Sequence, residues 1–269
     1  MNIIVCVKAV LDPELPPAKF RIDKNNNKVI PPEDMPPVIG SYDANAVEAG
    51  LQLKDAHGGK LTVISVGREP VSEAARHGLS MGADEAYMVA DGRLEQMDSA
   101  GTAYILSQAI KKLGEYDLVL CGRQAADTDS GLVGSLMAAK LGLPLVTVAR
   151  SLEMADGALR VEQVLTDGYR VFEVPLPALV TVGEEIGQPR LPSGWGVISA
   201  AKKEVPAWTL DDIDADPALV RSWAERLKLQ KLYIPVSARQ GEIIEGEDPA
   251  EAAANLAWPG SCGRWAWYR

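Results

Sequence analysis

The chain has 269 residues, of which 47% are hydrophobic and 24% charged, and no apolar run reaches the roughly 18 residues that a membrane span needs. The formal charge of −10 opposes general binding to phosphodiester backbones. Three cysteines, Cys6, Cys121 and Cys262, are scattered singly, which gives neither a disulfide framework nor a metal-ligand set. We therefore expect a globular, cytoplasmic protein without direct membrane insertion, nucleic acid or bound metal.

Strand and helix patterns alternate through the first half of the chain. Short runs rich in β-branched and apolar residues predict buried strands at 3–7, 61–66, 86–90 and 117–121. Helical periodicity lies between them, with Asp43 expected to cap one helix and Ser99 another. This alternation predicts an α/β fold with a doubly wound, mostly parallel sheet.

The alternation of strands and helices does not hold along the whole chain. The proline- and asparagine-rich stretch 11–40 is a long loop, and such loops are usually functional or disordered. After Pro144, extended segments joined by Asp156-Gly157 and Asp167-Gly168 predict hairpins, so antiparallel strands should extend the parallel sheet. Regular periodicity is lost from Gly183 onward, apart from helices expected at 217–228 and 249–257.

The last part of the chain is rich in tryptophan. Five of the six tryptophans lie beyond residue 200, namely Trp208, Trp223, Trp258, Trp265 and Trp267. Bulky aromatic side chains on an irregular tail need a surface to pack against. Composition leaves two surfaces open, a partner subunit and the chain's own domain.

Ligands of an open parallel sheet bind beyond the carboxyl ends of its strands. Four loops reach that edge: the residues after Val7, the turn 40–43, the turn 66–68 and the loop 121–135. The last enters a helix and carries hydroxyls, which suits a phosphate group. The alternative is structural, with Asp129 or Ser130 capping the helix and Gly134 packing on the sheet. Walker and GxGxxG phosphate motifs are absent.

Several motifs recur in a fixed order along the chain. They are Val5-Cys6-Val7-Lys8, Tyr42-Asp43 followed by Ala46-Val47-Glu48, Met81-Gly82-Ala83-Asp84, Gly122-Arg123-Gln124-Ala125-Ala126-Asp127, Asp129 and Val133-Gly134. In this order and spacing the chain resembles the beta subunit of electron transfer flavoproteins over nearly its whole length.

The resemblance implies a heterodimer whose alpha subunit carries flavin adenine dinucleotide (FAD). It also implies an adenine nucleotide in the beta subunit, which is adenosine monophosphate (AMP) in ordinary members and a second FAD, reduced by NADH, in electron-bifurcating members of anaerobes. The segments Cys121-Gly122-Arg123-Gln124 and Val133-Gly134 are closer to the anaerobe group. We therefore expect FAD, with AMP as the alternative. No catalytic side chain is expected, because the flavin carries the chemistry.

Carried over by position, the resemblance implies a set of cofactor-binding residues from the four loops. They are Cys6, Gly40, Ser41, Tyr42, Asp43, Val66, Arg123, Gln124, Ala125, Asp127, Thr128, Asp129, Ser130, Gly131, Leu132, Val133, Gly134 and Ser135.

The resemblance also divides the chain into three parts. Residues 1–182 are the nucleotide-binding domain, 183–205 a recognition loop, and 206–269 a C-terminal arm that packs on the alpha subunit. The recognition loop binds a partner such as acyl-CoA dehydrogenase or another flavin or quinone oxidoreductase, and Leu191 and Trp195 are its expected contacts. The alternative is that Trp195 packs into the chain's own sheet.

A different class of function shares the doubly wound fold. A nucleotide-sensing module of the universal stress type would bind a nucleotide without electron transfer. It would carry a Gly-x2-Gly-x9-Gly-Ser/Thr phosphate pattern near the end of a chain about half this length. This chain lacks that pattern.

Overall fold

The computed structural model describes residues 1–23, 25, 27–67, 71–94, 97–224, 226, 229–234 and 243–257. The chain divides into two units, Met1–Leu232 and Tyr233–Arg269. The second unit contains helix α7 (Pro249–Ala257), which begins and ends where the sequence predicts.

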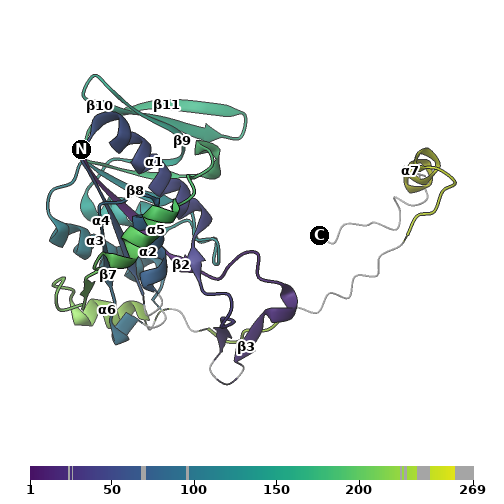
Figure 1. The fold of residues 1–269 in the computed structure, drawn as a ribbon, viewed down its shortest axis with the longest axis horizontal. Helices are drawn as coiled ribbons and strands as arrows, with labels where there is room; N and C mark the ends of the chain where they lie inside the picture. Colours follow the sequence, from purple (N-terminus) through teal and green to yellow (C-terminus); the bar gives the residue numbers. More distant parts are fainter. Residues whose placement is uncertain are drawn as a thin grey trace. The chain divides into compact units, whose positions relative to one another are not determined.

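One large sheet forms the centre of the first unit (Figure 1). Its order is β11-β10-β9-β12-β8-β1-β6-β7-β13. The strands are β1 (Asn2–Val7), β6 (Lys60–Val66), β7 (Glu85–Val89), β8 (Leu118–Gly122), β9 (Leu145–Ala155), β10 (Ala158–Leu165), β11 (Gly168–Val174), β12 (Ala178–Val182) and β13 (Ala207–Trp208). In this spatial order, every neighbouring pair from β9 to β13 is parallel. At the other end of the sheet, β10 pairs antiparallel with both β9 and β11. The predicted fold class is confirmed.

Helices cover both faces of this sheet (Figure 1). One layer contains α1 (Ser41–His57), α2 (Val71–Met81) and α5 (Gly194–Lys202), and the other α3 (Ser99–Leu113), α4 (Val133–Leu141) and α6 (Pro217–Ala224). Successive strand residues point to opposite faces, so Ile3 and Val5 of β1 enter one core whereas Ile4 and Cys6 enter the other.

Two predicted helix caps are wrong. Gly40 precedes α1 without a side-chain cap, because the carboxylate of Asp43 binds the backbone of two strand ends instead. Helix α3 begins at Ser99, but its cap is Asp98, whose side chain accepts the N–H of Gly101 at 2.7 Å. Asp98 has the extended backbone of an N-cap residue, which lets its carboxylate reach an N–H of the first helical turn.

The predicted hairpins are present. Asp156 and Gly157 join β9 to β10 with φ of 49° and 83°, the left-handed pair that a tight hairpin turn requires. The second turn is Thr166-Asp167, and β11 already begins at Gly168.

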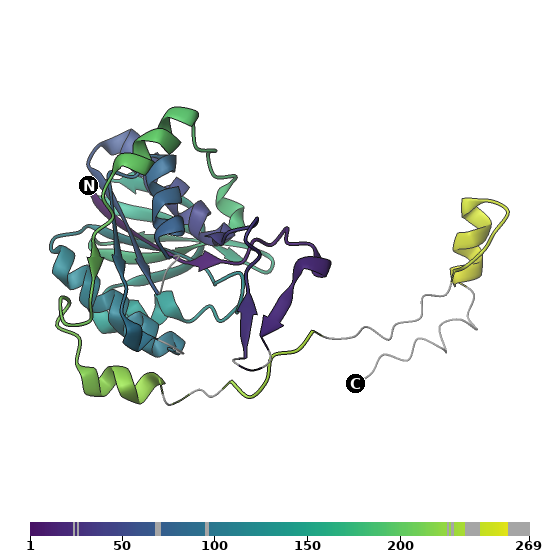
Figure 2. The same ribbon diagram turned by 60° about the horizontal axis from the view of Figure 1, so that its bottom comes forward.

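Short elements lie within the stretch 11–40 and directly before it (Figure 2). Strand β2 (Ala9–Val10) pairs with β5 (Val38–Ile39), and β3 (Arg21–Asp23) pairs with β4 (Lys28–Ile30). A single 3-10 turn, η1 (Pro17–Lys19), precedes β3.

The beginning of the tryptophan-rich region packs on its own domain. Trp208 in β13 stacks on Tyr87 with ring centroids 4.7 Å apart. Trp223 is 7% exposed, and its ring centroid lies 4.8 Å from that of Tyr104. Trp258, Trp265 and Trp267, and Cys262, lie outside the described residues, so packing of the arm on an alpha subunit stays a prediction.

Helix α6 ends at Ala224, and the predicted helix end at Lys228 lies outside the described residues. No helix in the described part of the chain is long and apolar enough to span a membrane.

Candidate nucleotide-binding site

The site lies where the winding of the sheet reverses. From β1 the chain proceeds through β6 to β7, then crosses back to β8 on the other side of β1. The crevice beyond β1 and β8 is the usual ligand position of such sheets. A pocket of about 350 Å³ is found there. It is lined by Cys6, Val7, Lys8, Asp43, Val66, Gly67, Leu94, Met97, Thr102, Ile105, Leu106, Cys121, Gly122, Arg123, Gln124, Ala125, Ser130, Gly131, Leu132, Val133 and Gly134.

Two buried thiols form the floor of this pocket. Cys6 on β1 and Cys121 on β8 are register partners, and they are 6% and 5% exposed. A hydrogen bond with Cys121 raises the pKa of the Cys6 thiol well above its usual value, and burial raises it further. The raised pKa favours the neutral thiol form of Cys6, which is a poor nucleophile.

Asp43 connects the two strand ends beside the pocket. Its Oδ2 accepts the backbone N–H of Lys8 at 2.8 Å, and its carboxylate also accepts the N–H of Gly122. A Cβ at Gly122 would overlap Oδ1 of Asp43, so this approach requires glycine. Burial raises the pKa of Asp43 to about 7, although the two N–H donors oppose the rise.

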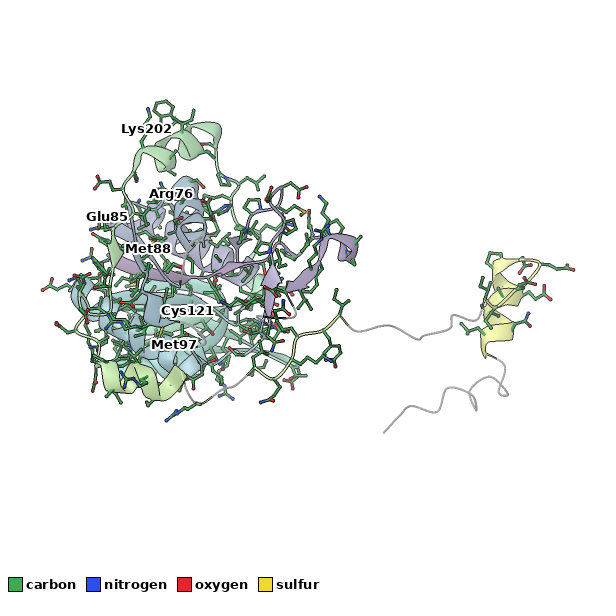
Figure 3. All side chains as sticks on the ribbon, turned by 90° about the horizontal axis from the view of Figure 1, so that it is seen from below. Arg76, Glu85, Met88, Met97, Cys121 and Lys202 are labelled. Atoms are coloured by element: carbon green, nitrogen blue, oxygen red, sulfur yellow. The ribbon has the colours of Figure 1, made fainter. Side chains whose placement is uncertain are left out.

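The side wall comes from a region that sequence reasoning did not assign to the site. Thr102, Ile105 and Leu106 line the pocket from α3, Met97 from the segment just before α3, and Leu94 from η2 (Gly92–Leu94). Figure 3 labels Met97 and Cys121, which share this pocket. The apolar α3 residues belong to an ordinary core-facing stripe, so no local signal distinguished them.

The loop between β8 and α4 covers the opposite side. Among the described residues no side chain caps α4, and Leu132 stands at its N-cap. Its first N–H groups are therefore available to solvent or a ligand, and Val133 and Gly134 line the pocket.

The alternative of a structural cap is wrong, because Asp129 accepts from Gln124 Nε2 at 3.0 Å and Ser130 Oγ bonds Ser99 Oγ at 3.3 Å. Packing of Gly134 on the sheet is confirmed, since an added Cβ would meet Thr181 Cγ2 at 2.6 Å.

Two cations at the pocket are already paired. Lys8 Nζ lies 2.7 and 2.8 Å from the two carboxylate oxygens of Asp127. Arg123 Nη1 lies 3.5 Å from Glu185 Oε1, and its guanidinium lies 5.0 Å from the ring centre of Tyr42. Backbone N–H groups and hydroxyls, rather than unpaired cations, are thus the donors available to an anionic ligand.

The structure brings most of the expected cofactor residues to one pocket. Those that line it are Cys6, Asp43, Val66, Arg123, Gln124, Ala125, Ser130, Gly131, Leu132, Val133 and Gly134. The other expected residues do not line it: Gly40, Ser41, Tyr42, Asp127, Thr128, Asp129 and Ser135. The Tyr42 ring contacts Arg123, and Asp127 binds Lys8, and both of these cations line the pocket.

The segment 183–205 is more regular than the sequence predicts. It contains η3 (Glu184–Ile186) and α5, which Ser193 caps by accepting the N–H of Gly196 at 3.0 Å. Trp195 in the first turn of α5 is 76% exposed and Leu191 is 90% exposed. The alternative that Trp195 packs into the chain's own sheet is therefore wrong.

The fold and the pocket define a doubly wound α/β protein with a ligand crevice at the switch point of its sheet. Comparison with known proteins narrows this class. The family model described as the electron transfer flavoprotein domain matches residues 33–213. The chain belongs to the electron transfer flavoprotein family.

Relatives match nearly end to end. The electron transfer flavoprotein subunit beta of Megasphaera elsdenii is 36% identical over 260 residues, 94% of each chain. The same subunit of Thermoanaerobacterium thermosaccharolyticum is 40% identical over 257 residues, 95% of this chain and 96% of the relative. The caffeyl-CoA reductase-Etf complex subunit CarD of Acetobacterium woodii is 35% identical over 257 residues, with the same coverage.

Proposed function

We propose that the chain is the beta subunit of a heterodimeric electron transfer flavoprotein and binds an adenine nucleotide in the pocket between β1 and β8. The observation that carries the proposal is the pocket itself: it lies at the switch point and joins an apolar wall to the uncapped start of α4. Family membership supplies the electron-transfer role.

FAD is the proposed nucleotide, with AMP as the alternative. Both need an apolar slot for a flat ring and N–H or hydroxyl donors for phosphate. Ile105 and Leu106 supply apolar wall, while Ser130 and the first N–H groups of α4 supply donors. These residues fit the group.

Bound FAD would supply hydride and single-electron chemistry, and the protein would orient it. Asp43 holds the ends of β1 and β8 together below the site. Ile105 and Leu106 exclude water from the α3 side. The neutral Cys6 thiol adds no charge to the floor. No described side chain of the pocket needs to act as acid, base or nucleophile.

The proposed partners are an alpha subunit with its own FAD and a dehydrogenase. NADH is the proposed electron donor if the pocket holds FAD, and acyl-CoA dehydrogenase or another flavin or quinone oxidoreductase is the proposed docking partner in the cytoplasm. Leu191 and Trp195, both strongly exposed, form the proposed contact. The nucleotide-sensing alternative is not favoured, because the family match covers residues 33–213.

The proposal is tested by producing the chain together with an alpha subunit and following flavin absorbance. A stable heterodimer whose flavin is reduced by NADH, or by acyl-CoA dehydrogenase with its substrate, is the expected result. A chain that binds nucleotide but forms no heterodimer and undergoes no flavin reduction would favour the sensing module.

A further inference from the structure

Helix α5 presents an apolar side to solvent. Leu191, just before it, and Trp195, Val197 and Ile198 within it are 90%, 76%, 53% and 51% exposed. An exposed group of large apolar side chains marks an interaction surface. The following inference rests on the proposed docking role of this segment and concerns what holds α5 in place.

The first attachment is a carboxylate on α1. Arg190 donates from Nε and Nη2 to the two oxygens of Glu48 at 2.7 and 3.1 Å, and its backbone N–H donates to the same carboxylate at 3.0 Å. Nη2 also reaches Asp55 at 2.9 Å. The Glu48 side chain is only 8% exposed. Burial would raise the pKa of Glu48, but the hydrogen bonds from Arg190 and Gln52, together with the charge of Arg190, outweigh it and lower the pKa. This forked pairing fixes direction as well as distance.

The second attachment is a close approach between helices α5 and α2. A Cβ added at Gly196 would overlap the carbonyl oxygen of Ser80, at the end of α2. Gly194, on the same helix, has open space around its Cβ position. Only one of these two glycines is therefore required for the contact.

The third attachment joins α2 to the end of α5, and Figure 3 labels Arg76 on α2 and Lys202, the last residue of α5. Arg76 on α2 donates from Nη1 to the carbonyl oxygens of Ala200 and Lys203 at 3.2 and 3.3 Å. Lys203 Nζ donates to the carbonyl oxygens of Ala83 and Asp84 at 3.1 and 2.9 Å. The Arg76 guanidinium thus binds two carbonyl oxygens at the end of α5, of which that of Ala200 also accepts the Lys203 N–H, and ties this helix end to the domain.

We propose that Arg190, Gly196 and Arg76 are positioning residues that hold α5 in its docking conformation before a partner binds. The partner would be a protein with an apolar recess that receives Trp195. Preformed helix structure removes the entropic cost of ordering the segment on association. The docking segment is accordingly preformed, and its affinity for the partner also depends on residues outside its apolar contact surface.

The experiment uses the heterodimer with the alpha subunit and compares Gly196→Ala and Arg190→Gln with the matched control Gly194→Ala. Hydrogen exchange reports on the amides of 194–202, and steady-state kinetics use acyl-CoA dehydrogenase with its substrate. We expect faster exchange and a KM for the dehydrogenase raised about tenfold, equivalent to about 1.4 kcal/mol. The rate at saturating dehydrogenase and the nucleotide content should stay unchanged. Gly194→Ala should behave as the wild type.

Combining Trp195→Ala with Gly196→Ala or Arg190→Gln distinguishes a failure of the positioning inference from a failure of the proposed docking function. If α5 is positioned by these residues, Trp195→Ala should raise KM less in the Gly196→Ala background than in the wild type. Unchanged exchange and KM in Gly196→Ala, beside a clear effect of Trp195→Ala, would overturn the inference and leave docking intact. If Trp195→Ala leaves KM unchanged in the wild type, the docking role itself fails.

Discussion

The Asp43 carboxylate accepts the backbone N–H of Lys8 at 2.8 Å, and this bond joins the first turn of α1 to the end of β1. The same carboxylate accepts from Gly122 at the end of β8. One buried side chain therefore fixes the spacing of the two strands that border the pocket. Its position explains why Asp43, alone among the residues of the turn 40–43, lines the pocket although it does not cap the helix.

The raised pKa of Asp43 predicts a dependence of stability on pH. Burial raises the pKa to about 7, so between about pH 4, its usual unfolded value, and pH 7 the folded state binds more protons than the unfolded state. The contribution of Asp43 to the free energy of unfolding should therefore fall as pH rises through this window, by at most about 1.4 kcal/mol per pH unit.

The measurement is denaturant unfolding from pH 5 to pH 8 for the wild type and Asp43→Asn. The lowered pKa of His77, caused by burial, acts in the opposite direction, so the difference between the two proteins isolates Asp43. A difference that does not change with pH would contradict the account.

Trp223→Ala should destabilise the domain. The Trp223 side chain is 7% exposed and packs on Tyr104, with Lys140 Nζ 4.9 Å from its ring centre. Truncation of such a buried ring costs about 3 to 5 kcal/mol. Thermal unfolding should show a clear drop in Tm, without a change in the KM for a dehydrogenase. An unchanged Tm would mean that this tryptophan is not part of the domain core.

Trp195→Ala should have the reverse effect. Because Trp195 is 76% exposed, its removal should leave Tm nearly unchanged. As a central contact it should raise the KM for acyl-CoA dehydrogenase by roughly thirtyfold, the equivalent of about 2 kcal/mol. Flavin content and flavin reduction should stay as in the wild type. A loss of Tm at constant KM would contradict the docking assignment.

The strands were predictable because their signals are local. The runs around Val5, Val63 and Leu120 are apolar and β-branched over strand length, and buried parallel strands require that composition. The Asp156-Gly157 turn was predictable for the same reason, because both residues tolerate the left-handed backbone that the hairpin needs.

The remaining features depend on tertiary contacts. Ile105 and Leu106 are apolar helix residues whether they face the core or a ligand, so sequence alone could not assign them to the pocket. Two glycines around Trp195 weaken the intrinsic helix signal of α5. The helix nevertheless forms, because Ser193 caps it and Arg76 binds its last carbonyls.

The nucleotide content of the heterodimer tests the central claim most directly. Ser130 lines the pocket, whereas Thr128 in the same loop is exposed and does not, so Ser130→Trp should fill the site and Thr128→Trp is the matched control. Nucleotides released by denaturation are then separated and counted. The account predicts one FAD from the alpha subunit and a second FAD from the beta pocket in the wild type and in Thr128→Trp, and loss of the second in Ser130→Trp. AMP in place of the second FAD would select the alternative nucleotide. A wild-type heterodimer with a single nucleotide, or an undiminished content in Ser130→Trp, would contradict the assignment of the pocket.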